Sequence, residues 1–288
     1  MLLLPLCLAT VSCVEKKAPS EAAPTNTQSF VVKGTIRELK PDGRTAVIRH
    51  EEIVNYMEAM TMPFRVRDTN ELAGLKPGDE VNFRLVVTED ASWIEHVTRT
   101  GRSAPVEPKR AVNITPTNDP GVFRLGNIPD FALTNEFGQT LSLHGFQGRA
   151  VAMTFFFTRC PIPEYCPRLT KNFQGAIEKL KAIPGGPTNF HFLSISFDPI
   201  DTPLVLRSYG SHYRYDSNHW SFVTGNIDQI QELARGFGVS VKLEGGTYDH
   251  SFSTAIFDAT GRLQNMWPIG GDMTDQIVTE MTKAAQAK

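Results

Sequence analysis

The chain begins with a short apolar run that is followed by a polar stretch without large hydrophobic residues. Residues 1–13 are rich in leucine, whereas residues 14–29 consist largely of Ala, Pro, Ser, Thr and Glu. The apolar run is too short to cross a bilayer but fits the apolar region of an export signal. The polar stretch cannot bury an apolar face, so we expect it to be a flexible tether. The pattern therefore predicts export, with residues 1–29 as signal and tether.

From residue 30 onward, short alternating runs of apolar and polar residues are separated by turn signals. Alternation at every second residue is typical of strands that bury one face, and the Gly- and Pro-containing segments 41–43 and 76–79 mark turns. The predicted strands are residues 30–36, 45–49, 62–66, 80–87 and 93–97. Five short strands without a long helix predict a small all-β domain over residues 30–100, an OB-like five-stranded barrel.

After a second polar, Pro-containing segment at residues 101–120, strands alternate with helices. The continuous apolar run 151–157 is typical of a strand inside a sheet that is covered on both faces. Further strands are predicted at 141–143, 190–197, 254–257 and 263–267, and helices at 168–182, 203–213, 227–236 and 272–285. This order predicts an α/β domain of thioredoxin-like type over residues 121–286.

Charge and cysteine content restrict the chemistry. The formal net charge of −2 over 288 residues gives no electrostatic reason to expect nucleic acid as a partner. Of the 4 cysteines, Cys7 and Cys13 lie in the apolar N-terminal run, which leaves only Cys160 and Cys166 in the body of the chain. In an exported protein, such an isolated pair points to metal binding or thiol chemistry more than to simple packing of small side chains.

The cysteine pair lies between a predicted strand and a predicted helix. Pro167 fits the first turn of that helix, so Cys166 lies at or beside the N-cap, where the helix dipole favours a thiolate. His250 comes shortly before the predicted strand at 254–257. Two thiolates and one imidazole suit a soft, thiophilic metal, and the same residues suit a redox dithiol with a neighbouring histidine.

A second candidate site lies in the all-β region. Met57, Met60 and Met62 are three of the 8 methionines in the chain. Met60 and Met62 alternate and therefore face the same side of a strand, and His50 at the end of the preceding strand can close the site. Thioether and imidazole ligands favour Cu(I) or Ag(I) over harder ions, although methionine more commonly fills gaps in a core.

Three motifs in the C-terminal part resemble the Sco/SenC family over residues 121–286. The motifs are Phe-Phe-Thr-Arg-Cys-Pro with a following Cys-Pro, the segment 194–203, and Asp-His-Ser at 249–251. Members of this family are membrane-anchored copper metallochaperones of thioredoxin fold that help to assemble the binuclear copper centre of cytochrome c oxidase. The resemblance implies that Cys160, Cys166 and His250 are copper ligands, that the two cysteines form a redox dithiol, and that Asp198 lies near the metal. The family usually leaves three residues between the cysteines, whereas this chain has five.

The string Met-Thr-Met-Pro-Phe that begins at Met60 resembles the CusF-like periplasmic copper-binding domain, a five-stranded barrel, over residues 30–99. This resemblance implies that His50, Met60 and Met62 are copper ligands. The best-known form of that domain has a tryptophan over the metal where this chain has Met57, which makes Met57 a candidate fourth ligand.

The segment Thr-Val-Ser-Cys that ends at Cys13 resembles a bacterial lipobox. This implies a periplasmic protein that is anchored to a membrane through a lipidated Cys13 or through an uncleaved signal. No Lys or Arg precedes the apolar run, so the sequence leaves open whether Met1 is the true start.

The resemblances together imply a periplasmic, membrane-tethered copper chaperone. Its cargo is copper, and its expected partners are a cytochrome c oxidase subunit, at the CuA site, or another apo-cuproenzyme, together with a periplasmic thiol reductant. We also expect copper to pass from the methionine site to the cysteine site within the chain, because two thiolates bind Cu(I) more strongly than thioethers do.

Two other functions stay open, and with them the question of whether the protein is an enzyme. The first is a thiol-disulfide oxidoreductase that keeps cysteines of a target reduced, and the second is copper sequestration for tolerance. Known thiol enzymes fit less well. A peroxiredoxin needs a threonine three residues before its reactive cysteine, whereas Thr158 lies two before Cys160, and no proline between Pro203 and Pro268 can serve as the cis-proline of a thioredoxin.

Overall fold

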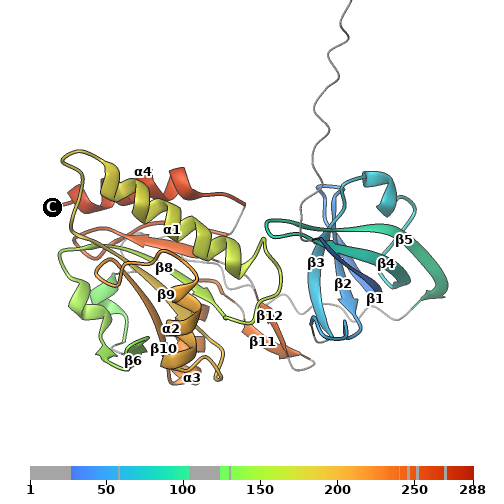
Figure 1. Ribbon diagram of the computed structural model, residues 1–288, viewed down its shortest axis with the longest axis horizontal. Coiled ribbons are helices and arrows are strands. Elements are labelled where there is room, and N and C mark those ends of the chain that lie inside the picture. The colour runs from blue at the N-terminus through green and yellow to red at the C-terminus, as the bar shows by residue number, and fades with distance from the viewer. Residues whose placement is uncertain are drawn as a thin grey trace, which may run out of the picture.

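The computed structural model describes residues 27–57, 59–103, 124–129, 131–239, 241–244, 247–250, 253–268 and 271–288, with the backbone alone for residues 242–244 and 247–250. The predicted signal with Cys7 and Cys13, nearly all of the tether, and most of the predicted linker lie outside these ranges. Figure 1 shows an all-β N-terminal domain beside an α/β C-terminal domain. No helix in the described part of the chain is both long and apolar enough to cross a membrane.

The N-terminal domain is one antiparallel sheet in the strand order β3-β2-β1-β4-β5. Its strands are β1 (Gln28–Leu39), β2 (Thr45–His50), β3 (Met60–Arg65), β4 (Asp79–Val87) and β5 (Ser92–Ser103). A bridge between Val66 and Ile94 brings the two edge strands together. The alternating positions face one shared interior, which confirms the predicted five-stranded all-β domain.

A glycine allows the close approach of β1 to β2 in this sheet. A Cβ atom on Gly34 would lie 2.6 Å from Ile48 Cγ2 and 2.7 Å from the carbonyl oxygen of Arg49. Only glycine therefore fits opposite the end of β2, where His50 lies.

The C-terminal domain is built around a seven-stranded sheet in the order β14-β13-β8-β9-β10-β6-β7. The strands β8, β9 and β10 run parallel, and β13 pairs with β8 in the antiparallel sense. Every residue of β8 and β9 is buried, as expected for strands covered on both faces. The strands are β6 (Leu133–Asn135), β7 (Thr140–Leu141), β8 (Ala150–Phe156), β9 (Phe190–Ser196), β10 (Trp220–Gly225), β13 (Thr254–Phe257) and β14 (Leu263–Trp267).

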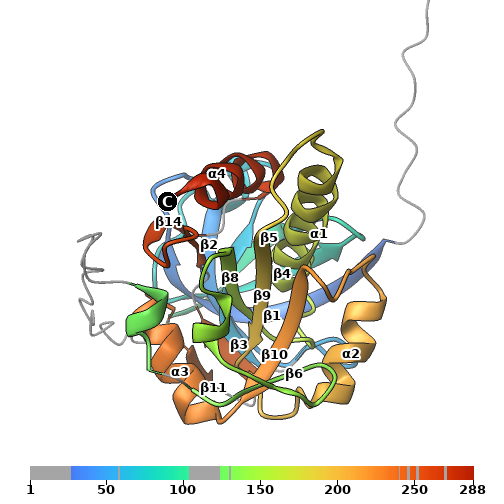
Figure 2. The ribbon, with the colours of Figure 1, turned by 90° about the vertical axis from the view of Figure 1, so that its left-hand side faces the viewer.

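Helices lie on both faces of this sheet (Figure 2). On one face, Phe156 packs against Tyr209 of α2, whose hydroxyl lies 2.9 Å from Thr170 Oγ1 of α1. On the other face, Phe155 packs against Phe237 at the end of α3. The helices are α1 (Cys166–Ala182), α2 (Pro203–Ser211), α3 (Ile227–Gly236) and α4 (Thr274–Gln286). The thioredoxin-like α/β prediction is confirmed.

Some elements differ from those predicted. The predicted strand 141–143 is wrong at its end, because Leu143–Phe146 forms a 3-10 turn. Sequence periodicity also did not indicate β6, β10 or a separate hairpin of β11 (Val241–Glu244) and β12 (Thr247–His250). This hairpin lies beside β3 of the N-terminal domain, as Figure 1 shows.

Candidate metal sites

The cysteine loop leads from the central strand β8 into α1. Cys166 is the first residue of α1, with Pro167 in the first turn, as predicted. The loop is folded on itself, because the backbone N–H of Tyr165 donates to the carbonyl of Ile162 at 3.0 Å. Cys160 is 9% exposed and Cys166 is fully buried, and both are free thiols. The structure therefore holds the two thiols at one end of the sheet, shielded from bulk water.

The two thiols differ in their readiness to ionise. Burial acts to raise the pKa of Cys160, but hydrogen bonds from the thiol and the backbone N–H of Cys166 bring that pKa below its ordinary value. Burial, followed by the hydrogen bond to Cys160 and its charge, raises the pKa of Cys166 well above its ordinary value. The prediction that the helix dipole favours a Cys166 thiolate is therefore wrong. The start of α1 acts on Cys160, because the Cys166 N–H points to the neighbouring sulfur.

Two buried carboxylates hold the residues that precede Cys160. Asp201 accepts hydrogen bonds from the backbone N–H of Thr158 at 2.9 Å, from its hydroxyl at 2.5 Å, and from the hydroxyl of Ser196 at 2.6 Å. Asp198 accepts from Arg159 Nε at 2.9 Å. Burial raises the pKa of Asp201 despite these hydrogen bonds, and its negative charge contributes to the raised pKa of Cys166.

The sequence motifs predicted that Asp198 lies near the metal, but no role was predicted for Asp201. The sequence did contain an indication of this role, because Asp198 and Asp201 are three residues apart in the segment 194–203. The structure shows that Asp198 fixes Arg159 and that Asp201 fixes Thr158, so the pair orients the loop at Cys160.

The third predicted ligand of this site, His250, has its backbone in β12, opposite Val241. Its side chain lies outside the described residues. Among the described residues, no group of three or more His, Cys, Asp and Glu side chains is arranged to hold a metal ion. The ligand set Cys160, Cys166 and His250 stays a prediction.

The structure brings the predicted N-terminal ligands together at one end of the β2–β3 hairpin. His50 is paired directly with Met60 across the two strands, and Met62 lies two residues farther along β3 on the same face. Met57 lies in the connecting loop, where its N–H donates to the carbonyl of Ile53 at 3.0 Å. All four candidate ligands are buried, with His50 only 1% exposed.

His50 presents a lone pair in this buried site. Its Nδ1 lies 2.7 Å from the carbonyl oxygen of Glu51, which can only accept, so Nδ1 carries the proton. Its Nε2 is buried without a hydrogen-bond partner among the described residues. Burial lowers the pKa of His50, so the ring is neutral. An unpaired buried nitrogen costs about 1–3 kcal/mol, whereas a soft metal ion would use this lone pair.

The two candidate sites belong to domains that touch each other, which sequence analysis did not predict. The hydroxyl of Tyr56 donates to the carbonyl of Pro161 at 2.7 Å, and the hydroxyl of Tyr165 donates to the carbonyl of Pro63 at 2.6 Å. Glu164 accepts hydrogen bonds from the backbone N–H and the hydroxyl of Ser92, the latter at 2.8 Å. The loop between the cysteines is thus in direct contact with the N-terminal domain.

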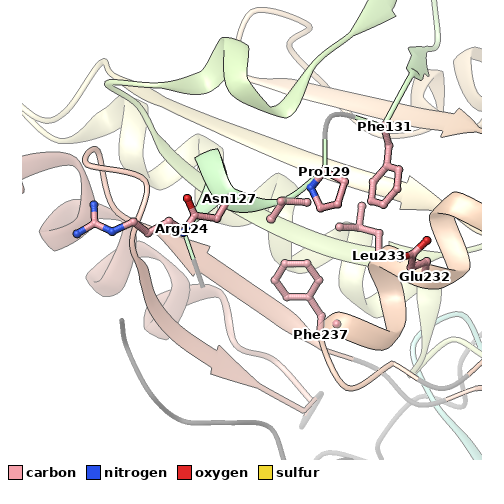
Figure 3. A pocket seen from close by; sticks show the side chains of 9 residues that line it. Arg124, Asn127, Pro129, Phe131, Glu232, Leu233 and Phe237 are labelled. Atoms are coloured by element: carbon pink, nitrogen blue, oxygen red, sulfur yellow. The ribbon is translucent and has the colours of Figure 1, made fainter. Parts of the chain in front are cut away.

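A cavity of about 250 Å³ lies elsewhere, between the segment before β6 and α3 (Figure 3). Its walls are largely apolar, with Arg124, Asn127 and Glu232 as the polar members. None of the candidate ligands lines this cavity, so it is separate from both sites.

Two family models match separate parts of the chain. A family model described as SCO1/SenC matches residues 124–286, which is more than half of the chain. A second model, described as the copper binding periplasmic protein CusF, matches residues 29–99. A search of curated proteins found no match.

Several solved structures are similar to part of the chain. A SCO1/SenC family lipoprotein from Bacillus anthracis str. Ames has 24% identity and a TM-score of 0.48, over 54% of this chain and 93% of that one. Arabidopsis thaliana ScoI with copper bound has 23% identity and a TM-score of 0.46, over 54% of this chain and 94% of that one. BsSco, described as a Sco family cytochrome c oxidase assembly protein with a disulfide switch, has 26% identity and a TM-score of 0.49, over 56% of this chain and 94% of that one.

Proposed function

The chain belongs to the SCO1/SenC family, and from this membership and the geometry of its two candidate sites we propose that it is a copper metallochaperone. The observation that carries the proposal is the pair of free, buried thiols, Cys160 in the loop before α1 and Cys166 at its first residue, in a chain whose N-terminal domain matches a model of a copper-binding protein. The proposal treats residues 30–100 and 121–286 as two domains joined by residues 101–120.

Each domain holds one copper ion in this proposal. The C-terminal site uses Cys160, Cys166 and His250. The N-terminal site uses the ligands at the end of the β2–β3 hairpin, namely His50, Met60 and Met62, with Met57 as a further ligand. Thiolate, thioether and imidazole groups are the donors that soft Cu(I) prefers. The buried lone pair of His50 supports the N-terminal site, because no described residue uses it.

The recipient in this proposal is an apo-cuproenzyme, with the CuA site of cytochrome c oxidase as the expected target. The resemblance of the three C-terminal motifs to a family with that task supports the assignment. The match of the N-terminal domain to a model of a periplasmic copper-binding protein supports a periplasmic location, and a lipidated Cys13 or an uncleaved signal would tether the chain to a membrane.

The protein groups have separate tasks in this chemistry. Copper binding requires both sulfurs as thiolates, so Cys160 loses its proton first and Cys166 follows when the metal arrives. Asp198 and Asp201 hold the loop so that Cys160 stays beside Cys166. Metal and disulfide are mutually exclusive, because both use the same two sulfur atoms.

The test is metal analysis with thiol counting on the purified full chain. We expect about two Cu(I) per chain, and about one in the Cys160→Ser/Cys166→Ser variant. The same copper content in that variant and in the unchanged protein would contradict the proposal. Transfer to an isolated apo-CuA domain separates delivery from sequestration, since a storage protein retains its copper.

The difference between the two thiols favours thiol-disulfide oxidoreductase activity as the second candidate. A lowered pKa at Cys160 beside a protonated Cys166 is the arrangement of an attacking and a resolving thiol. Turnover of an oxidised CuA domain by the reduced, copper-free protein would support this function. Transfer of copper without such turnover would support the chaperone.

A further inference from the structure

The loop between the cysteines makes more contacts than metal binding requires. Of its five residues, Pro161, Glu164 and Tyr165 each form a hydrogen bond with the N-terminal domain. The partners come from three separate segments of that domain: the β2–β3 loop, β3 and the start of β5. The loop is therefore a contact surface for the N-terminal domain as well as the segment that joins the two cysteines.

These contacts lie next to both candidate sites. The bond from Tyr56 to Pro161 joins the immediate sequence neighbours of Met57 and Cys160. The bond from Tyr165 to Pro63 joins the neighbours of Cys166 and Met62 in the same way. The strand that bears His250 lies beside β3. The predicted ligands of both sites therefore lie on segments that meet at one interface.

A polar flank extends this interface along α1. Lys171 Nζ lies 2.6 Å from Asp90 Oδ1, and Arg168 donates to the carbonyl of Asp90 at 3.1 Å. The ring of Tyr56 stacks on Phe30 of β1 with 4.4 Å between ring centroids, which orients the hydroxyl toward Pro161. Interfaces made largely of hydroxyl, carboxylate and carbonyl contacts are typical of domains that can separate and dock again.

We propose that the inter-cysteine loop is a docking element for the chain's own N-terminal domain, and that copper passes directly between the two sites in this docked arrangement. The inference rests on the proposed function. In the transfer, the bonds from Cu(I) to the imidazole and the thioethers break, and bonds to the sulfurs of Cys160 and Cys166 form. The two thiols release their protons to water. Copper stays Cu(I), so the step needs neither oxidant nor reductant.

The direction and the rate of copper transfer both follow from the docked arrangement of the two sites. Thiolates bind Cu(I) more strongly than thioethers, so transfer runs from the methionine site to the cysteines. Two sites on one chain meet at an effective concentration in the millimolar range, and docking adds a fixed orientation to this.

Docking is tested first, without copper, on the full chain. A carbodiimide couples a lysine amine to a carboxylate in contact with it and releases water. Of the crosslinks expected in the unchanged protein, peptide mass mapping follows two: Lys171 to Asp90 across the interface, and Lys179 to Asp275 within the C-terminal domain, where the ion pair also measures 2.6 Å.

The docking variant combines Tyr56→Phe, Glu164→Ala and Tyr165→Phe, which removes the hydrogen bonds between the inter-cysteine loop and the N-terminal domain and keeps every candidate ligand. Loss of these bonds lowers the docking equilibrium roughly a hundredfold, so the Lys171–Asp90 crosslink should disappear while the Lys179–Asp275 crosslink remains. The control variant, Tyr213→Phe with Glu178→Ala, removes similar groups from the C-terminal domain and should keep both crosslinks. A Lys171–Asp90 crosslink that persists in the docking variant overturns the docking element.

Transfer is then followed by protection of the cysteines. The reduced full chain receives Cu(I) as a chelator complex, and samples are quenched with a thiol-alkylating reagent, since copper-bound cysteines do not react. We expect the docking variant to reach protection roughly tenfold more slowly than the unchanged protein and the control variant. A variant with His50→Leu, Met60→Leu and Met62→Leu gives the rate of direct transfer from the chelator, and this rate should also be lower.

The outcomes separate the inference from the proposed function. Equal rates in all variants, with both cysteines finally protected, overturn the intrachain transfer and leave the chaperone function standing. Cysteines that are never protected in the unchanged protein overturn the proposed function, and the transfer with it. A slow docking variant that reaches the same final protection supports both.

Discussion

The two candidate sites are built in different ways. In the N-terminal site, the pairing of β2 with β3 places His50 opposite Met60, so backbone hydrogen bonds fix the ligands. In the C-terminal site, the cysteines lie in a loop and at the first residue of a helix, and buried aspartates hold the segment that precedes Cys160. A site on a strand ladder needs little support from other side chains, whereas a site on a loop depends on such support.

The donor atoms of the two sites also differ in their chemistry. Thioethers neither titrate nor form disulfides, and burial keeps His50 neutral. The cysteines titrate, interact with each other and can be oxidised. The N-terminal site therefore suits retention of Cu(I) in oxidising surroundings. At the C-terminal site, copper binding depends on the protonation and the oxidation state of the two cysteines.

The largest effect is expected when the support of the loop site is removed. Asp201→Ala leaves the two donors of Thr158 and the hydroxyl of Ser196 without their buried acceptor, so we expect a loss of about 3 kcal/mol in the free energy of unfolding. Denaturant unfolding of the copper-free protein measures this loss. A change below about 1 kcal/mol would show that the loop does not depend on Asp201.

The next largest effect concerns the difference in pKa between the two thiols. Because the pKa of Cys160 is lowered and that of Cys166 is raised, Cys160 holds its thiolate at lower pH. Near pH 7 we expect alkylation of Cys160 to be roughly tenfold faster than that of Cys166 or more, with an apparent pKa of Cys160 below its ordinary value. Timed alkylation with peptide mass analysis gives both rates. Faster reaction at Cys166 would reverse the assigned roles.

A smaller effect is expected at the ladder site. His50→Leu removes a buried nitrogen that has no partner among the described residues, and it also removes the hydrogen bond from Nδ1 to the carbonyl of Glu51. Because these two effects oppose each other, the free energy of unfolding of the copper-free protein should change by no more than about 1 kcal/mol. The same substitution should weaken Cu(I) binding at this site by roughly tenfold or more. Thermal unfolding and a competition titration with a Cu(I) chelator measure the two quantities. Lower stability with unchanged copper affinity would make His50 a core residue only.

The smallest effect is expected at the surface pair that flanks the interface. Asp90→Asn removes an ion pair whose side chains are 67% and 35% exposed, so the free energy of unfolding should change by no more than about 0.5 kcal/mol. Asp275→Asn is the matched control, because it breaks the corresponding pair with Lys179. A loss several times larger for Asp90→Asn would mean that the domain contact is a main source of stability.

Local patterns in the sequence predicted most of the framework. Alternation predicted the five strands of the N-terminal domain, and helical spacing predicted α1 to α4. The strand β10 was not predicted, because its short apolar run follows a polar stretch without a clear period. The hairpin β11–β12 was not predicted either, since its residues are largely polar and include glycines.

The sequence predicted where the two candidate sites lie more completely than it predicted their hydrogen bonds, pKa shifts and supporting residues. The position of Cys166 at the start of α1 followed from Pro167, but the lowered pKa of Cys160 depends on hydrogen bonds that only the folded loop creates. The contact of Tyr56 with Pro161 joins residues that are 105 positions apart, and such a pair leaves no local pattern. The role of Asp201 also depends on the fold, because its partner Thr158 comes from another strand end.

The most direct test of the account is a titration of the reduced full chain with Cu(I), in which alkylation counts the free thiols after each addition. We predict that about one equivalent protects both Cys160 and Cys166, and that a second equivalent binds without any change in thiol count and is lost when His50, Met60 and Met62 are all replaced by leucine. Binding of the first equivalent while both cysteines remain open to alkylation would contradict it.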